Sequence, residues 1–214
     1  MRNAFSIVKD FEEAVCEYTG APMCVAVNSC TNALFLCLEY SSQNWDFSRK
    51  REVEIPKYTY ISVPMQIKHV GLNVKFRDED WSGAYELKPL QIWDSARRFT
   101  SNMWKGFNSQ LKFGESFVYV CTSHHWSKIL GIQQGGCILH NDIRADEWFN
   151  RARFDGRTEG VAPKDDFFKQ LGWHMYMSPE IAAEGLVRLS HLPRNNPDLP
   201  NDKYPDLSTM GIFK

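Results

Sequence analysis

The 214-residue chain lacks an excess of charge of either sign. It contains 25 Lys and Arg residues against 26 Asp and Glu residues, which leaves a net charge of −1. Nucleic acids and anionic membranes are bound by strongly basic surfaces. The charge balance therefore predicts neither nucleic acid nor a membrane as a partner.

Long hydrophobic runs are also missing. No apolar stretch approaches the length of a membrane span. The first residues, MRNAFSIVKDFEEA, lack the apolar core of a secretory signal. We therefore expect a cytoplasmic protein.

The six cysteines include no pair with the CxxC spacing that is typical of metal or redox sites. In a cytoplasmic chain they are expected to be buried, reduced thiols. One alternative is a metal site built from Cys121, His124 and His125. Adjacent histidines point in divergent directions on most backbones, and no second ligand cluster is evident. We therefore expect no bound metal.

Internal repeats and low-complexity tracts are absent, and helical and strand patterns instead alternate along the chain. Apolar spacing predicts helices at 5–18, 32–40, 59–70, 142–153, 165–171 and 179–191, and strands at 24–27, 52–55, 73–76, 91–93, 117–121 and 136–140. This alternation predicts an α/β fold: a three-layer α/β/α sandwich with a mainly parallel sheet. Residues 1–192 are expected to form this domain. Residues 193–214, rich in proline, are expected to form an irregular tail on the body or on a partner.

The stretch around Lys128 carries the most chemical information. A strand-like run, Phe117 to Cys121, leads into a polar loop with Ser123, His125 and Lys128, and a Gly-Gly pair follows. A lone lysine is nearly always a solvated surface group. A lysine presented between two buried elements, however, is what pyridoxal phosphate (PLP) enzymes need to form a Schiff base.

Four segments, in the same order, resemble motifs of the DegT/StrS-type sugar aminotransferases, a family of fold-type I PLP enzymes. They are VNSCTNALFLCL (27–38), IPKYTYISVPMQIKHVGLNVKFRDED (55–80), QIWDSARRF (91–99) and SHHWSK (123–128). The resemblance implies a reduced PLP-transferase large domain. It also implies PLP as the cofactor, with Lys128 as the catalytic lysine that carries the cofactor and shuttles a proton.

The resemblance assigns the cofactor's phosphate to the first and fourth segments. Ser123 matches the family's phosphate-binding serine, and His125 matches its histidine. Cys30 and Thr31 stand where a turn feeds a helix N-terminus, which favours an anion. Cys30 replaces the usual glycine or alanine. An ordinary helix cap would have the same sequence pattern.

The cofactor ring is assigned to the middle segments. Tyr60 matches the aromatic residue that stacks on the pyridine ring, although taken by itself it is more typical of a core aromatic. Asp94 matches the carboxylate that faces the ring nitrogen, and the alternative is a strand-end aspartate that opens a turn. Arg97 stands where the family has glutamine.

A later segment suggests a second subunit. GWHMYMSPEIAAEGL (172–186) resembles a family motif whose asparagine reaches the phosphate in the neighbouring subunit. His174 occupies that position, and Tyr176 replaces a usual arginine. The resemblance therefore implies a homodimer with a shared active site.

These assignments predict a PLP-dependent aminotransferase. The resemblance implies an amino acid donor such as glutamate and a keto acceptor on a nucleotide-linked sugar. The alternative is a catalytically degenerate PLP-binding or regulatory protein of the same fold, because we expect the family's small C-terminal domain to be absent and only residues 81–93 separate two motifs. Dehydratases of the family replace the lysine with histidine, and Lys128 argues against that reaction.

Overall fold

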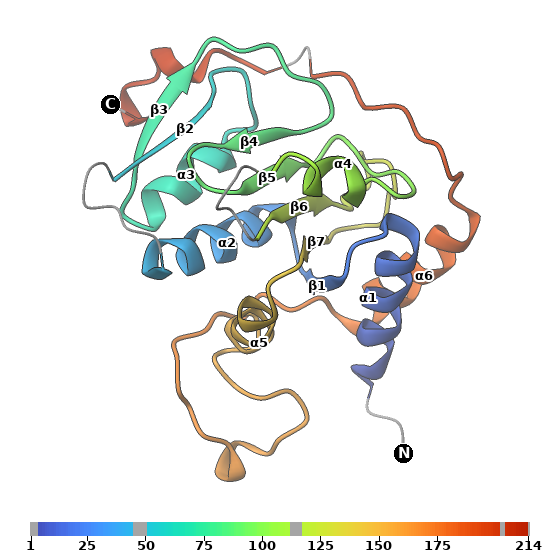
Figure 1. The fold of residues 1–214 in the computed structure, drawn as a ribbon. Coiled ribbons are helices and arrows are strands. Elements are labelled where there is room, and N and C mark those ends of the chain that lie inside the picture. The colour runs from blue at the N-terminus through green and yellow to red at the C-terminus, as the bar shows by residue number, and fades with distance from the viewer. Residues whose placement is uncertain (1–3, 45–50, 112–116, 202–203, 214) are drawn as a thin grey trace.

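The computed structural model describes residues 4–44, 51–111, 117–201 and 204–213, and Figure 1 shows their arrangement. The strands are β1 (Met23–Val27), β2 (Glu52–Pro56), β3 (Asn73–Arg77), β4 (Tyr85–Leu87), β5 (Ile92–Ser95), β6 (Tyr119–Ser123) and β7 (Gly136–His140). The α-helices are α1 (Ser6–Thr19), α2 (Cys30–Asn44), α3 (Ser62–His69), α4 (Trp104–Asn108), α5 (Ile143–Ala152) and α6 (Pro179–His191). Short 3₁₀ turns are η1 (Pro163–Asp165), η2 (Leu207–Thr209) and η3 (Gly211–Phe213).

The main sheet has the order β1-β7-β6-β5-β4, and β2 and β3 form a parallel pair beside it. Glu54 on β2 and Lys88 next to β4 exchange backbone hydrogen bonds of 2.7 and 3.1 Å, which link the two sheets. Among the described strands of the main sheet, only β5 and β6 are parallel. The predicted α/β class is confirmed, but a mainly parallel sheet is wrong.

The reason for this difference is the length of the connections. A parallel pair needs a crossover of a dozen or more residues, usually with a helix. β4 and β5 are joined by the short segment 88–91, and the loop from β6 to β7 carries no helix. Each of these connections therefore produces an antiparallel pair.

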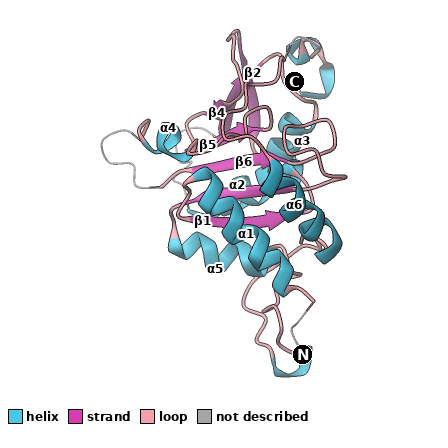
Figure 2. Ribbon diagram, turned by 90° about the vertical axis from the view of Figure 1, so that its right-hand side faces the viewer, coloured by secondary structure: helices cyan, strands magenta, loops and turns pink. Residues whose placement is uncertain are grey.

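Two apolar cores form on the two faces of the main sheet, because successive strand residues point to opposite sides. On β6, Cys121 packs in the core with α2, α3 and α5, whereas Val120 packs in the core with α1 and α6. Figure 2 shows α1 and α6 together over one face of the strands. Both faces are therefore covered by helices.

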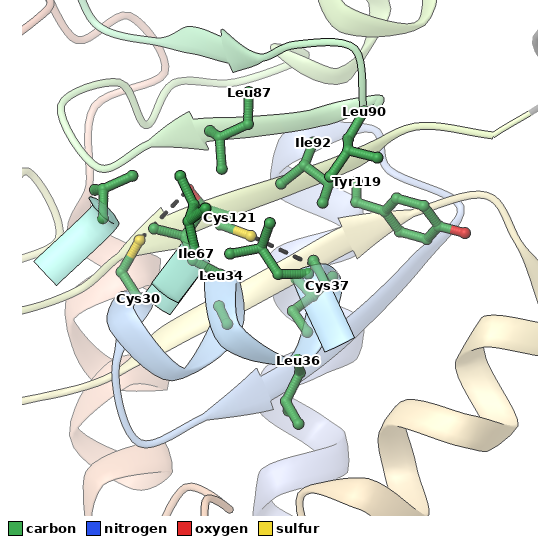
Figure 3. Packing of buried hydrophobic residues seen from close by; sticks show 14 of the residues in the cluster. Cys30, Leu34, Leu36, Cys37, Ile67, Leu87, Leu90, Ile92, Tyr119 and Cys121 are labelled. Atoms are coloured by element: carbon green, nitrogen blue, oxygen red, sulfur yellow. Dashed lines mark hydrogen bonds between the residues drawn. The ribbon is translucent and has the colours of Figure 1, made fainter. Parts of the chain in front are cut away.

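Helix α2 packs its thiols against strand β6, as Figure 3 shows. The Sγ atoms of Cys37 and Cys121 lie 3.6 Å apart, and the Cys30 Sγ lies 3.7 Å from the carbonyl oxygen of Cys121. All six cysteines are free, and five of them are buried. The thiols therefore act as small core side chains, as the sequence predicted.

Most expected elements are present within a few residues, but the predicted helix at 165–171 is wrong. The chain there is irregular, and Phe167 and Leu171 are 77% and 83% exposed. The Asp166 carboxylate accepts hydrogen bonds from the backbone of Thr158 and of Phe167. Such side-chain bonds to the backbone compete with helix formation.

Beyond α6, residues 193–201 and 204–213 lie across the body of the molecule, and we call them the C-terminal strap (Figure 1). Leu207 is fully buried and Phe213 is 5% exposed. The strap thus adds apolar contacts to the fold. Within the described residues, no helix combines the length and apolar character that a membrane crossing requires.

Candidate functional site

A cavity of about 340 Å³ opens where β1, β5 and β6 end and β7 begins. In α/β folds ligands bind outside the carboxyl ends of the strands. The cavity wall includes residues from all four of the segments singled out in the sequence. Seven predicted site residues line it: Cys30, Thr31, Tyr60, Asp94, Ser123, His125 and Lys128.

Lys128 enters the cavity from the loop that follows β6. Its backbone N–H donates to the carbonyl oxygen of His125 at 2.8 Å, which closes a tight turn. The side chain is half-buried, and its ammonium forms no ion pair with any described residue. Burial and the nearby Arg97 charge lower the pKa of Lys128, whereas Asp94 and Cys30 act in the opposite direction. The amine is therefore shifted toward its neutral, nucleophilic form.

Asp94 lies on β5 and is only 5% exposed. Its Oδ1 accepts from the Ala96 N–H and its Oδ2 from the Tyr85 hydroxyl, both at 2.9 Å, and that hydroxyl is also hydrogen bonded to Thr59. Burial raises the pKa of Asp94, and these hydrogen bonds oppose the rise. The Asp94 carboxylate is thus held in one orientation, and no cationic side chain among the described residues is bonded to it.

The start of α2 forms a polar cradle at one side of the cavity. The Ser29 hydroxyl accepts from the Asn32 N–H at 3.2 Å, and the Thr31 and Ser62 hydroxyls lie 3.0 Å apart. The first N–H groups of a helix have no intrahelical acceptor, and they carry a partial positive charge. The cradle therefore suits an anion.

Gly136 lets strand β7 approach this cradle closely. A Cβ atom at Gly136 would lie 2.5 Å from the backbone nitrogen of Cys30 and 2.7 Å from the carbonyl oxygen of Thr122. Real Cβ atoms do not approach backbone so closely. The glycine therefore sets the position of the α2 N-terminus against the sheet.

The two adjacent histidines have opposite environments. His125 is exposed at the cavity, and its Nδ1 lies 2.9 Å from the Ser127 hydroxyl. His124 is fully buried, and its Nε2 lies 3.3 Å from the Sγ of Cys137. Burial lowers the pKa of His124 to about 3. In the described part of the chain, no three His, Cys, Asp or Glu side chains are placed to share a metal ion.

Two predicted residues lie outside the cavity wall. Arg97 is next to it, and its Nε donates to the Tyr204 hydroxyl at 2.9 Å. The His174 side chain is 71% exposed, and its Nδ1 lies 3.2 Å from the Asp155 carboxylate. A role of His174 toward a second subunit stays a prediction.

Sequence reasoning missed several residues of the wall. The Trp81 and Tyr204 rings are stacked at 17° with centroids 6.2 Å apart, and Tyr60, 56% exposed, lies 6.5 Å from Tyr204. These rings form an aromatic rim on the cavity. Tyr204 comes from the strap, and no local sequence pattern predicts its contact with the distant Trp81. Tyr85, which holds Asp94, was missed because β4 has only three residues.

Comparison with known proteins gives one family and a group of similar folds. Residues 3–102 match the model of the DegT/DnrJ/EryC1/StrS aminotransferase family. A search of curated proteins found no match.

Among solved structures, PseC of Helicobacter pylori, an aminotransferase involved in the biosynthesis of pseudoaminic acid, is 17% identical with a TM-score of 0.64; the match covers 86% of this chain and 57% of that one. CalS13 of Micromonospora echinospora, a sugar aminotransferase, is also 17% identical with a TM-score of 0.64, covering 86% and 61%. AtS13 of Actinomadura melliaura is 19% identical with a TM-score of 0.66, covering 86% and 59%. The likeness is one of fold, and this chain spans less than two thirds of the length of each of the three.

Proposed function

Because residues 3–102 match the model of the DegT/DnrJ/EryC1/StrS aminotransferase family, we propose that the chain is a member of that family and a PLP-dependent sugar aminotransferase. It moves an amino group from an amino acid, with glutamate as the expected donor, to a keto group on a nucleotide-linked sugar. The observation that carries the proposal is a half-buried lysine, Lys128, in one cavity with a buried carboxylate, Asp94, and the helix N-terminus at Thr31.

The cavity fits PLP group by group. The amine of Lys128 suits the aldehyde, and the cradle of Thr31, Ser123 and the α2 N–H groups suits the phosphate. Asp94 is the decisive part of the fit. A buried carboxylate that lacks an ion-pair partner is costly, and a protonated ring nitrogen would supply the missing cation. When bound, PLP provides an electron sink for charge that develops on the substrate carbon.

The residues of the chain divide the remaining work. Lys128, with its lowered pKa, can give and take a proton near the substrate carbon. Tyr85 and Thr59 hold the Asp94 carboxylate in one orientation. Tyr60 is available to cover the ring from the rim of the cavity.

We further propose a homodimer, in which His174 of one subunit reaches the site of the other. The exposed side chain of His174 is compatible with that role.

The six free thiols are compatible with a location in the reducing cytoplasm. Helices on both sheet faces support a reduced three-layer arrangement. The proposed dimer can be tested by analytical sedimentation of the purified protein.

The test of the proposal is a titration of the purified protein with PLP. We expect a visible absorption band from lysine-bound PLP, and borohydride treatment should leave the label on Lys128 in peptide mapping. Lys128→Ala should abolish both signals. The exposed Lys105 offers a matched control, because Lys105→Ala should leave them unchanged. A wild-type protein that stays colourless at saturating PLP contradicts the proposal.

One observation favours a second candidate, a PLP-binding protein without turnover: Cys30 stands where the family usually has glycine or alanine, and Arg97 stands where it has glutamine. Addition of glutamate to the PLP-loaded protein separates the two functions. An aminotransferase releases 2-oxoglutarate and loses the visible band. A protein that only binds PLP keeps the band and releases no oxo acid.

A further inference from the structure

The C-terminal strap is fixed to the body on both sides of Tyr204. Before it, the Asp198 carboxylate accepts two hydrogen bonds from Arg98, at 2.6 and 2.9 Å. After it, the Leu207 N–H donates to the Lys57 carbonyl oxygen at 3.0 Å, and the Leu207 side chain is fully buried. The described residues of the strap are therefore anchored to the body both before and after Tyr204.

The seat of Asp198 is shaped for this contact. A Cβ atom at Gly83 would lie 2.3 Å from the Asp198 carboxylate, and Gly83 has a φ of 69°. A side chain there would push the carboxylate away. The Ser82 hydroxyl adds a hydrogen bond of 3.1 Å to the same carboxylate. The Asp198 carboxylate of the strap thus packs directly against the backbone of the loop before β4.

Tyr204 is the strap residue that reaches the cavity, and it contacts Arg97. Its ring lines the cavity, and the guanidinium carbon of Arg97 lies 4.9 Å from the ring centroid. Its hydroxyl accepts the 2.9 Å hydrogen bond from Arg97 Nε. The strap also reaches the main chain of Arg97, because the Leu199 N–H donates to its carbonyl oxygen at 2.9 Å. Arg97 is therefore held through both its backbone and its side chain.

The location of this guanidinium matters because it is charged at every relevant pH. A half-buried arginine side chain that lies near another cation is repelled by it. A specific contact is therefore needed to hold the guanidinium in place. The groups that act on Lys128 are Arg97, Asp94 and Cys30. The ionisable side chains of His125, Tyr60 and Tyr204 also line the cavity. Of these groups, Arg97 carries the fixed positive charge.

We propose that Tyr204 is a positioning residue, through which the C-terminal strap holds the Arg97 guanidinium beside Lys128 and Asp94. The strap is then part of the site in the same chain. Without the tyrosine hydroxyl, Arg97 turns toward water and its repulsion of the protonated Lys128 weakens. This inference concerns the protein without cofactor, and it stands whether or not PLP binds.

The experiment measures how readily Lys128 is acetylated by trace acetic anhydride across a pH series, with peptide mass spectrometry as readout. Tyr204→Phe keeps the ring and removes the hydrogen-bond acceptor. We expect the midpoint of Lys128 labelling to rise by roughly half a pH unit, the order expected for one nearby solvent-screened charge. Arg97→Gln should give the same rise, and the double variant no more than either single one. The labelling of exposed Lys105 provides an internal reference.

Two further variants complete the design. Asp198→Asn loosens the strap at its seat and should raise the midpoint in the same direction. Ile212→Ala, in the same strap but 64% exposed, should leave the midpoint unchanged. Circular dichroism confirms that each variant is folded. A wild-type midpoint in Tyr204→Phe, with or without a shift in Arg97→Gln, overturns the inference. Failure to bind PLP would contradict the proposed function and leave this result untouched.

Discussion

At the scale of single residues, His124 makes the stability of the protein dependent on pH. The unfolded chain protonates this side chain below its ordinary pKa of 6.5, whereas burial in the folded protein lowers the pKa to about 3. The unfolded state thus binds more protons between these values, and stability falls as the pH falls. We expect a loss of about 2 kcal/mol between pH 7 and pH 5. Urea unfolding of wild type and His124→Gln measures it.

The control for this prediction is the neighbouring histidine. His125→Gln changes an exposed side chain and should keep the wild-type pH dependence. A His124→Gln variant whose stability falls as steeply as that of the wild type between pH 7 and pH 5 contradicts the assignment.

Tyr85 gives a second prediction at this scale. Tyr85→Phe leaves Asp94 Oδ2 and the Thr59 hydroxyl without their buried partner. We expect a destabilisation of about 1–3 kcal/mol, together with a further rise in the pKa of Asp94. Thermal unfolding measures the first effect. Tyr58→Phe, at a residue that is 40% exposed, is the control, and an equal loss in both variants would refute the argument.

At the scale of elements, a buried ion pair joins α1, β1 and the end of α5. Glu12 is 4% exposed and Arg153 fully buried; they are hydrogen bonded to each other and to the backbone of Ala26. Among the described residues, removal of Glu12 leaves the buried Arg153 guanidinium with only the longer, 3.8 Å pair to the partly exposed Glu159. We expect Glu12→Ala to cost about 3–5 kcal/mol in chemical denaturation. Glu184→Ala breaks the exposed 3.1 Å pair with Arg188 and should cost less than about 1 kcal/mol; similar costs for both would contradict the prediction.

At the scale of the whole molecule, we expect the strap to unfold together with the rest of the fold. Leu207→Ala removes a fully buried side chain and should cost about 2–5 kcal/mol in one cooperative transition. Ile212→Ala, at an exposed position of the same strap, should stay within about 0.5 kcal/mol. Differential scanning calorimetry makes the comparison. A wild-type melting temperature for Leu207→Ala would mean that the strap is a loose appendage.

The motifs in the sequence predicted seven of the residues that gather at the cavity, whereas the predicted residues Arg97 and His174 lie outside its wall. Lys128, Asp94 and Thr31 each follow or end a strand, and strand ends meet at one edge of a sheet. The positions of Tyr85 and Tyr204 could not be predicted in this way. The contacts of Tyr85 depend on strand pairing, and those of Tyr204 depend on the strap folding back over the body. Both involve residues far apart in the sequence, so neither produces a local periodic pattern.

The sequence by itself determined the α/β class, most helix and strand positions and the chemistry offered at the cavity, because periodicity and residue type are local properties. Only the tertiary structure decided that the main sheet is mostly antiparallel, that His124 is buried while His125 faces the cavity, and that the strap brings Tyr204 to Arg97. Each of these outcomes depends on which distant surfaces bury one another. Burial between segments far apart in the chain is a property of the folded molecule.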